Sequence, residues 1–342
     1  YVDRLNRKYV MIFSDAFIAV CALVLLVILQ NENVNLIWIY VLLGLRSIGN
    51  AFHTPALQAI APLIVPQSEL IKVAGINQVL HSVCSIGGPA IGTLAIAYLP
   101  ISMVLYLDLI GALLAILSLV MVKIPDLVTK SKSSIHSITT DFLEGFQTIS
   151  KNKGLRYLFL YAMAITFIMM PAAIMFPLLT TGHYAGGKWE MGVVEVVWGG
   201  GMLIGGAILS TFKLKGSKVV AVNVMYVLLG LTFILSGALP ASWFVGFVLT
   251  TAIGGISLSV FNGCFTAIVQ TEVSPEKLGR VFSLYYSLAV LPSVIGLLFT
   301  GLIAEVIGVN ISFIISGCLA ILVGILSFGT RNLMQLDKIK NV

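Results

Sequence analysis

Residues 311–330 read ISFIISGCLAILVGILSFGT, twenty consecutive residues without a charged side chain. A helix of about 20 apolar residues is long enough to cross the hydrocarbon core of a bilayer. Nine further segments have the same character, and the ten predicted spans are 9–29, 36–60, 73–99, 101–124, 155–180, 189–212, 218–239, 243–270, 279–304 and 311–330. A membrane β-barrel would instead show segments of about 10 residues with alternating polarity. The sequence therefore predicts an all-α integral membrane protein with a polytopic helical bundle.

The composition of the whole chain supports this prediction. Of 342 residues, 58% are hydrophobic and 10% are charged, and the mean hydropathy is +1.04. Soluble domains carry about 25% charged residues, and a soluble fold with this balance would expose large apolar patches. A soluble enzyme, a nucleic-acid-binding protein and a disordered protein are excluded. A membrane enzyme would need a nucleophile–base pair or a metal cluster facing a cavity, and the sequence offers neither, so no enzymatic activity is expected.

The positive charges define an orientation. Lysine and arginine accumulate on the cytoplasmic side of membrane proteins. With the N-terminus in the cytoplasm, the cytoplasmic loops and ends hold eighteen of the 20 lysines and arginines, whereas Lys188 lies outside and Arg46 lies within a span. Both ends of the chain are therefore predicted to be cytoplasmic. The net charge of +6 is explained by this orientation and requires no nucleic-acid partner.

A weak internal repeat has an offset of 208 residues. The pattern Leu-x-basic-Val at Leu70–Val73 recurs at Leu278–Val281, and the same offset carries Arg7 onto Lys215. A duplicated six-helix unit would begin well before Tyr1, so we expect helices three to twelve of a twelve-helix fold, with the N-terminus truncated. Parallel repeats of this kind place a substrate site near the bilayer midplane between the two halves.

The repeat predicts three parts of the chain. Residues 1–124 form an incomplete N-terminal half with four spans, and residues 155–342 form a C-terminal half with six. Residues 125–154 form a cytoplasmic linker, in which apolar residues at helical spacing predict a short amphipathic helix on the inner membrane surface. A mobile tether with incidental apolar residues is the alternative.

Four ionisable residues lie well inside predicted spans, namely Asp15, Arg46, Asp108 and Glu195. A charge at a helix centre costs about 2.5–3.5 kcal/mol, so each is a candidate for transport or proton coupling. Arg46 is placed about 15 Å deep at 1.5 Å per residue, near the midplane. A structural clamp is the alternative for each, and Asp15 can instead anchor the basic loop that precedes it. His53 and His81 are weaker candidates for proton relay.

Small residues and prolines interrupt several spans. Gly88 and Gly92 are spaced for close backbone approach, and Pro89 removes a helix hydrogen bond between them. Gly201 and Gly205 form a second such pair. Helices that bend and slide suit alternating access, although static bundles use the same spacing.

Several motifs resemble the major facilitator superfamily. YVDRLNRK at 1–8 resembles the second half of its cytoplasmic loop motif Gly-x-Leu-Ala-Asp-Arg-x-x-Arg-Lys, and LRSIG at 45–49 resembles its helix-four motif with a buried arginine. GPAIG at 88–92 resembles the helix-five Gly-Pro motif of exporters that exchange substrate for protons. The stretches 50–66, 106–108 and 279–284 are similar to the macrolide-efflux and enterobactin-exporter branch.

The resemblance implies a proton-coupled exporter of amphipathic small molecules, of drug, macrolide or siderophore type, in a bacterial inner membrane. It would work as a monomer among membrane lipids by alternating access, with the proton gradient as energy source and no cofactor. Arg46 would organise a charged network, the Gly88–Gly92 bend would limit leak, and a cytoplasmic latch would consist of Asp3, Arg4, Arg7 and Lys8. The alternatives are a lipid or nutrient facilitator or importer, such as a lysophospholipid flippase, and a non-transporting receptor or scaffold.

Overall fold

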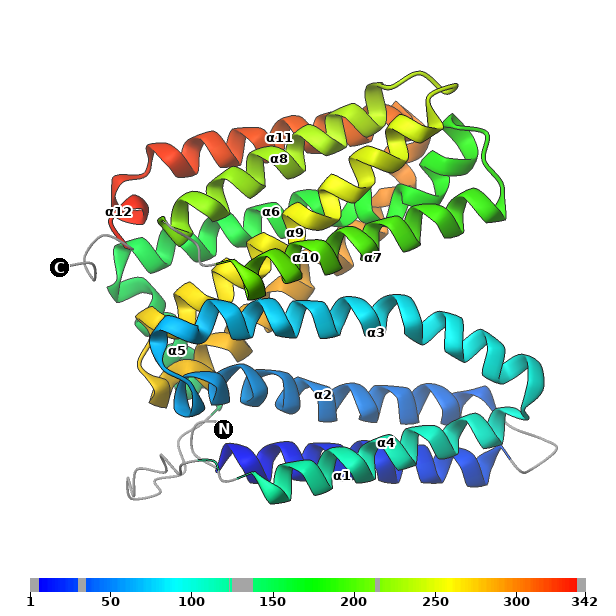
Figure 1. Ribbon diagram of the computed structural model, residues 1–342, viewed down its shortest axis with the longest axis vertical. Helices are drawn as coiled ribbons and strands as arrows, with labels where there is room; N and C mark the ends of the chain where they lie inside the picture. The colour runs from blue at the N-terminus through cyan, green and yellow to red at the C-terminus, as the bar shows by residue number, and fades with distance from the viewer. Residues whose placement is uncertain (1–5, 30–34, 123, 125–137, 213–215, 337–342) are drawn as a thin grey trace. The chain divides into compact units, whose positions relative to one another are not determined.

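The computed structural model describes residues 6–29, 35–122, 124, 138–212 and 216–336, which are helical apart from short connections and contain no β-strand (Figure 1). The long helices are α1 (Arg7–Ile28), α2 (Leu36–Ile64), α3 (Leu70–Tyr98), α4 (Ile101–Met121), α6 (Lys153–Leu178), α7 (Lys188–Thr211), α8 (Lys218–Ala238), α9 (Phe244–Glu272), α10 (Leu278–Ile307) and α11 (Val309–Gly329). The short elements are α5 (Ile138–Lys151), α12 (Arg331–Met334), the 3₁₀ turns η1 (Gln67–Glu69) and η3 (Pro275–Lys277), and the π-helical turn η2 (Leu179–His183). The predicted all-α fold is confirmed for these residues.

Eight of the described helices are long and apolar enough to cross a membrane, namely α1, α2, α4, α6, α7, α8, α9 and α11. Helices α3 and α10 coincide with the predicted spans 73–99 and 279–304 and contain 29 and 30 residues. Some side chains of each of these two helices are outside the part of the chain that the structure describes. The total of ten spans therefore stays a prediction.

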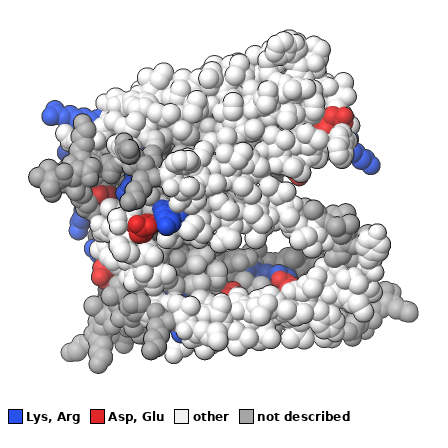
Figure 2. All heavy atoms as spheres, in the orientation of Figure 1, with Lys and Arg blue, Asp and Glu red and all other residues white. Residues whose placement is uncertain are grey.

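Helix α11 shows how such a helix divides its surface. Large apolar side chains recur every third or fourth residue on its exposed side, at Ile311, Ile315, Leu319 and Leu322. Its buried side carries small residues, including Gly317 and Gly324. In water this exposed stripe would be unfavourable, but it is the expected surface of a helix that faces lipid. Charged side chains likewise occupy little of the face drawn in Figure 2.

The described chain forms two compact units, and each combines several stretches of sequence. One unit contains residues 1–67, 87–146 and 273–284. The other contains residues 68–86, 147–272 and 285–342. In the first unit α1 packs along both α2 and α4, and in the second α8 packs between α9 and α11 (Figure 1).

The repeat predicted from sequence is confirmed by the helix boundaries. Adding 208 residues to both ends of α2 gives the ends of α9, and the same addition converts α4 into α11. It also converts η1 into η3 and the first residue of α3 into the first residue of α10. The two parts of the chain therefore contain the same succession of helices and 3₁₀ turns.

Glycines allow the helices of the second unit to approach closely. A Cβ on Gly205 of α7 would lie 2.7 Å from the Ile256 carbonyl oxygen of α9, and one on Gly201 would overlap the Ala252 carbonyl. A Cβ on Gly230 of α8 would lie 2.6 Å from the Gly317 carbonyl oxygen of α11. The close approach predicted at Gly201 and Gly205 is confirmed.

Candidate functional site

An ion pair joins two of the predicted site residues within the first unit. The Nη2 atom of Arg46 on α2 lies 2.6 Å from the Oδ2 atom of Asp108 on α4. The side chains are 25% and 39% exposed, so neither is sealed in a protein core. Arg46 is ten residues from the start of α2 and Asp108 is seven from the start of α4, which places them about 15 Å and 10 Å along their helices. Their similar depth lets the long arginine side chain span the gap.

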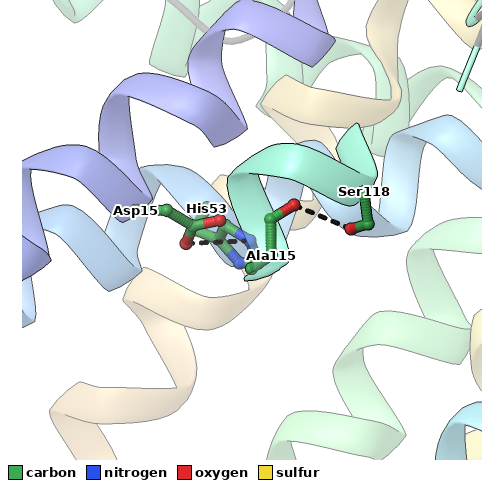
Figure 3. A network of polar contacts seen from close by, with 4 residues as sticks. All are labelled: Asp15, His53, Ala115 and Ser118. Atoms are coloured by element: carbon green, nitrogen blue, oxygen red, sulfur yellow. Dashed lines mark hydrogen bonds and ion pairs between the residues drawn. The ribbon is translucent and has the colours of Figure 1, made fainter. Parts of the chain in front are cut away.

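A second acid–base pair lies further along α2 and joins it to α1. The Nε2 atom of His53 on α2 is 3.5 Å from the Oδ1 atom of Asp15 on α1, and the side chains are 24% and 16% exposed. The two side chains point toward one another in Figure 3, which also shows the Ser118 hydroxyl on α4 donating to the Ala115 carbonyl. Asp15 therefore pairs with a histidine. The sequence suggested two roles for Asp15, namely proton coupling or anchoring of the basic loop that precedes it.

Helix α2 carries the basic member of both pairs. Arg46 and His53 are seven residues apart, which is two helical turns, so they lie on one side of α2 about 10 Å apart. Gly49 lies between them, and a Cβ there would be 2.7 Å from Ile18 Cγ1 and 3.4 Å from the Ser14 carbonyl oxygen of α1. The absence of a side chain at Gly49 lets α1 come close enough for Asp15 to meet His53.

The four side chains of the two pairs differ in whether they can change charge. An arginine stays protonated, whereas a carboxylate or imidazole can gain or lose a proton. Protonation of Asp108 would remove the charge that holds Arg46, and the same holds for Asp15 and His53. The two pairs thus bring one permanent cation and three titratable side chains together along α2.

Glu195 belongs to the other unit. It is an exposed residue of α7, and no ion pair to it occurs among the described residues. His81 on α3 is also exposed, and its Nδ1 atom lies 3.4 Å from the Ser85 hydroxyl of the same helix. The structure thus joins Asp15, Arg46 and Asp108 into pairs and leaves Glu195 separate.

The loop motif is partly described, since Asp3 and Arg4 lie outside the described residues. Arg7 is 6% exposed, and its guanidinium donates to the Ala59 carbonyl of α2 at 2.7 Å and to the Pro275 carbonyl at η3. Lys8 donates from Nζ to the Val120 and Val122 carbonyls, at 2.9 and 2.8 Å. Lys8 therefore binds carbonyl groups at the C-terminal end of α4, where a cation is favoured by the helix dipole, whereas Arg7 binds carbonyl groups within α2 and at the start of η3.

The Gly-Pro motif is in α3, a continuous helix through Gly88, Pro89 and Gly92. A Cβ on Gly88 or Gly92 would meet no described atom within 4 Å. The close helix approach expected at these glycines is not present among the described residues, in contrast to Gly201 and Gly205. The role of the motif in limiting leak stays a prediction.

An apolar groove of about 550 Å³ runs along α1 and α2. It is lined by Asn6, Tyr9, Val10, Phe13, Ser14, Phe17, Ile48, Gly49 and Phe52. None of the four charged candidates lines it. Within the described ranges no three His, Cys, Asp or Glu side chains are grouped in a way that could hold a metal ion.

Comparisons with known proteins agree with this architecture. A protein-family model described as Major Facilitator Superfamily matches residues 1–238. Macrolide efflux protein A of Streptococcus pyogenes is 35% identical over 336 residues, covering 98% of this chain and 83% of that protein. The protein of the same name from Enterococcus faecalis is 35% identical over 296 residues, covering 86% of this chain and 92% of that protein. The multidrug efflux pump Tap of Mycobacterium bovis is 21% identical, covering 98% of this chain and 81% of the pump.

Solved structures show the same fold. The human organic anion transporter MFSD10 has a TM-score of 0.80 at 19% identity, covering 95% of this chain and 78% of that chain. The Escherichia coli fucose:proton symporter FucP has a TM-score of 0.73 at 13% identity, covering 96% of this chain and 85% of that chain. Since the family and the relatives are transporters, the chain is a membrane transporter and not an enzyme. With a family model that covers most of its length, the chain belongs to the Major Facilitator Superfamily.

Proposed function

We propose that this transporter exports amphipathic small molecules of the macrolide and drug type in exchange for protons. The observation that carries the proposal is the Arg46–Asp108 ion pair inside two candidate membrane spans. The direction of transport and the substrate class are supported by the macrolide efflux proteins, which match nearly the whole chain. A siderophore is a second substrate class compatible with the resemblance noted in the sequence.

Proton coupling follows because a proton and the Arg46 guanidinium compete for the carboxylate of Asp108. A proton that reaches Asp108 from the outer side neutralises its carboxylate and releases Arg46. When the proton leaves toward the cytoplasm, the carboxylate binds Arg46 again, and the pair is reset. The Asp15–His53 pair, further toward the predicted cytoplasmic end of α2, provides a second position for the proton. Glu195 is a further proton-binding candidate in the other unit.

Alternating access is proposed to occur between residues 1–124 and 155–342, connected by the linker 125–154. In this scheme ten spans cross the inner membrane of a bacterium, with both chain ends in the cytoplasm. The protein works as a monomer surrounded by lipid, and the proton gradient supplies the energy. Arg7 and Lys8, with Asp3 and Arg4, form the cytoplasmic latch, and the segment with Gly88, Pro89 and Gly92 limits leak.

The proposal is tested by macrolide efflux from loaded bacterial cells that express the full-length protein. We expect efflux from wild-type cells to stop when the proton gradient is collapsed. Arg46→Ala should reduce efflux at least about tenfold, because it removes the guanidinium that pairs with Asp108. Lys72→Ala is the matched control, since Lys72 is 57% exposed and should be dispensable. Normal efflux from Arg46→Ala cells, together with insensitivity to the gradient, would contradict the proposal.

A reconstituted system separates export from import. In vesicles with the protein oriented as in cells, a macrolide should stimulate proton movement opposite to its own. A lysophospholipid should produce no such movement. Proton release stimulated by the lipid but not by the macrolide would favour the alternative of a lipid facilitator.

A further inference from the structure

Helix α7 packs closely on two neighbours within the second unit. A Cβ on Gly199 would overlap the side chain of Ile86 on α3. Gly201 and Gly205 approach α9 in the same way, as described above. At 3.6 residues per turn, Gly199 lies about 140° around the helix from the middle of the Gly201–Gly205 pair. One side of α7 therefore lies between the directions of α3 and α9.

Glu195 lies on this side of α7. Glu195, Met202 and Leu209 follow one another at intervals of seven residues, so the three side chains fall within about 40° of one another. Met202 and Leu209 are 8% and 2% exposed, so packing closes this side over the second half of the helix. Glu195, in the first half, is exposed. Its carboxylate therefore stands where the same side of α7 is no longer covered by described residues.

The exposed apolar residues of α7 lie on its opposite side. Ile204 and Ile208 are 49% and 41% exposed, and they lie about 180° and 140° around the helix from Glu195. Because α7 is a candidate membrane span, these isoleucines mark the side that faces lipid. Glu195 is directed away from that side, as is usual for an ionisable residue that faces the interior of a helix bundle or a water-filled cavity.

Two polarisable side chains flank Glu195 along α7. Met191, one turn before it, and Trp198, one turn after it, lie within about 60° of its direction, and both are partly buried. The Trp198 ring is held by two other helices. Its centroid is 5.5 Å from that of the Phe176 ring on α6, and a Cβ on Gly254 of α9 would lie 2.8 Å from its Cζ3 atom. The indole is therefore a fixed surface one helical turn from the carboxylate.

This combination of side chains matches an organic cation. A carboxylate attracts the positive charge, and the face of an indole is the most favourable aromatic partner for it. The flexible thioether of methionine adapts to apolar groups of different shape. A calcium or magnesium ion would need several oxygen ligands, and the described residues contain no group of three acidic, histidine or cysteine side chains that could hold one. Gly192, one turn before Glu195, is exposed and a Cβ on it would meet no described atom within 4 Å, which leaves space for a ligand.

We propose that Glu195 binds the protonated amine of the exported molecule, with Met191 and Trp198 against the carbon atoms around the nitrogen. The substrate class is then a lipophilic ammonium, which includes macrolides with a basic amino sugar and disfavours neutral ones. This inference rests on the proposed function, since it concerns the molecule that is exported. It assigns the carboxylate of Glu195 to the substrate in place of the proton, which is left to the Arg46–Asp108 pair.

The test is equilibrium binding to the purified full-length protein in lipid nanodiscs at neutral pH, without a proton gradient. The probes are erythromycin, whose tertiary amine is protonated under these conditions, and an analogue in which an acetyl group replaces one N-methyl group and makes the nitrogen neutral. We expect the wild type to bind erythromycin at least about tenfold more tightly than the neutral analogue. Glu195→Gln should reduce this ratio of affinities to about twofold or less, while its affinity for the neutral analogue stays near that of the wild type.

Further variants separate recognition of the amine from general damage to the protein. Glu276→Gln is the matched control, because Glu276 is an exposed acid of η3, outside the candidate spans, and its loss should leave the ratio of affinities unchanged. Trp198→Leu should lower the ratio at least about twofold, and Trp198→Phe should lower it less because an aromatic face remains. Since the ratio compares two ligands on one variant, a smaller yield of folded protein does not alter it.

Equal affinities of the wild type for the two macrolides, or an undiminished ratio in Glu195→Gln, would overturn the proposal. Tetraphenylphosphonium, a permanent lipophilic cation, distinguishes its failure from failure of the proposed function. If neither macrolide binds but this cation does, and Glu195→Gln weakens its binding at least about fivefold, the macrolide substrate is wrong and the cation site stands. If the cation also fails to bind, or binds equally well to Glu195→Gln, the cation site is refuted too.

Discussion

The guanidinium of Arg46 and the carboxylate of Asp108 are 2.6 Å apart, although 62 residues separate them in the chain. Each lies inside a helix that can span a membrane. An isolated charge there costs about 2.5–3.5 kcal/mol, and pairing offsets much of this cost. Both side chains of the pair are also partly exposed. The charges of the pair are therefore compensated, and the pair is not sealed in a core.

The exchanged pair Arg46→Asp with Asp108→Arg tests whether the contact is direct. Each single substitution leaves two like charges in place of an ion pair, and we expect low yield and loss of efflux for both. The double variant regains an opposite-charge pair and should recover membrane yield to within about twofold of wild type. Yield is measured by fluorescence-detected size exclusion. A double variant that is no better than the singles would show that the two residues act separately.

Gly49→Ala should weaken efflux without unfolding the protein. The added methyl group meets Ile18 Cγ1 at 2.7 Å, so either the Ile18 side chain or α1 itself must shift, and a shift of α1 would move Asp15 away from His53. We expect a reduction in efflux of about three- to tenfold, within the range for a displaced positioning contact. Gly44→Ala on the same helix is the matched control, because a Cβ there meets nothing within 4 Å. Equal efflux by the two variants would contradict this account of Gly49.

Gly205→Ala and Gly200→Ala on α7 should change stability in opposite directions. At Gly205 the new methyl group meets the Ile256 carbonyl oxygen and Ser259 Cβ at 2.7 and 2.8 Å, and overpacking of this kind costs about 1–3 kcal/mol. At Gly200 it meets nothing within 4 Å, and alanine favours a helix over glycine by up to about 1 kcal/mol. Thermal unfolding in detergent measures both, and a Tm for Gly205→Ala equal to or above that of Gly200→Ala would refute the packing argument.

Arg7→Ala should be far more harmful than Lys8→Ala. The buried Arg7 donates to two carbonyl groups on separate elements, and hydrogen bonds from a charged group contribute about 1.5–3 kcal/mol each. Lys8 is partly exposed, and its Nζ atom binds carbonyl groups at the end of α4, where a cation contributes about 0.3–1 kcal/mol. Membrane yield and efflux should therefore fall for Arg7→Ala and remain near wild type for Lys8→Ala. The reverse order would exclude Arg7 as the main element of the latch.

The helices were predictable because a membrane-spanning helix requires about 20 consecutive apolar residues, and such runs can be recognised in the sequence. Uninterrupted apolar runs marked segments such as 311–330, and the 208-residue offset anticipated that α2 and α9, or α4 and α11, have matching ends. Asp15, Arg46 and Asp108, three of the side chains that form the two pairs, were identified for the same reason, since a charge in a span is conspicuous.

The pairing of those charges was not predictable. Which acid meets Arg46 depends on how α2 and α4 are rotated and packed, and hydropathy contains no information about helix rotation. His53 was a weak candidate from sequence because nothing there links it to Asp15. The only local signal was the spacing of Arg46, Gly49 and His53, which places two bases on one side of α2 with a glycine between them.

The exchange of protons for substrate at Arg46 and Asp108 is the central claim, and counterflow of protons in reconstituted vesicles measures it most directly. In vesicles that contain the full-length protein and an internal pH dye, adding a macrolide should drive proton movement in the opposite direction. Asp108→Asn should abolish that signal while macrolide still binds. An undiminished proton signal in Asp108→Asn vesicles would contradict the account.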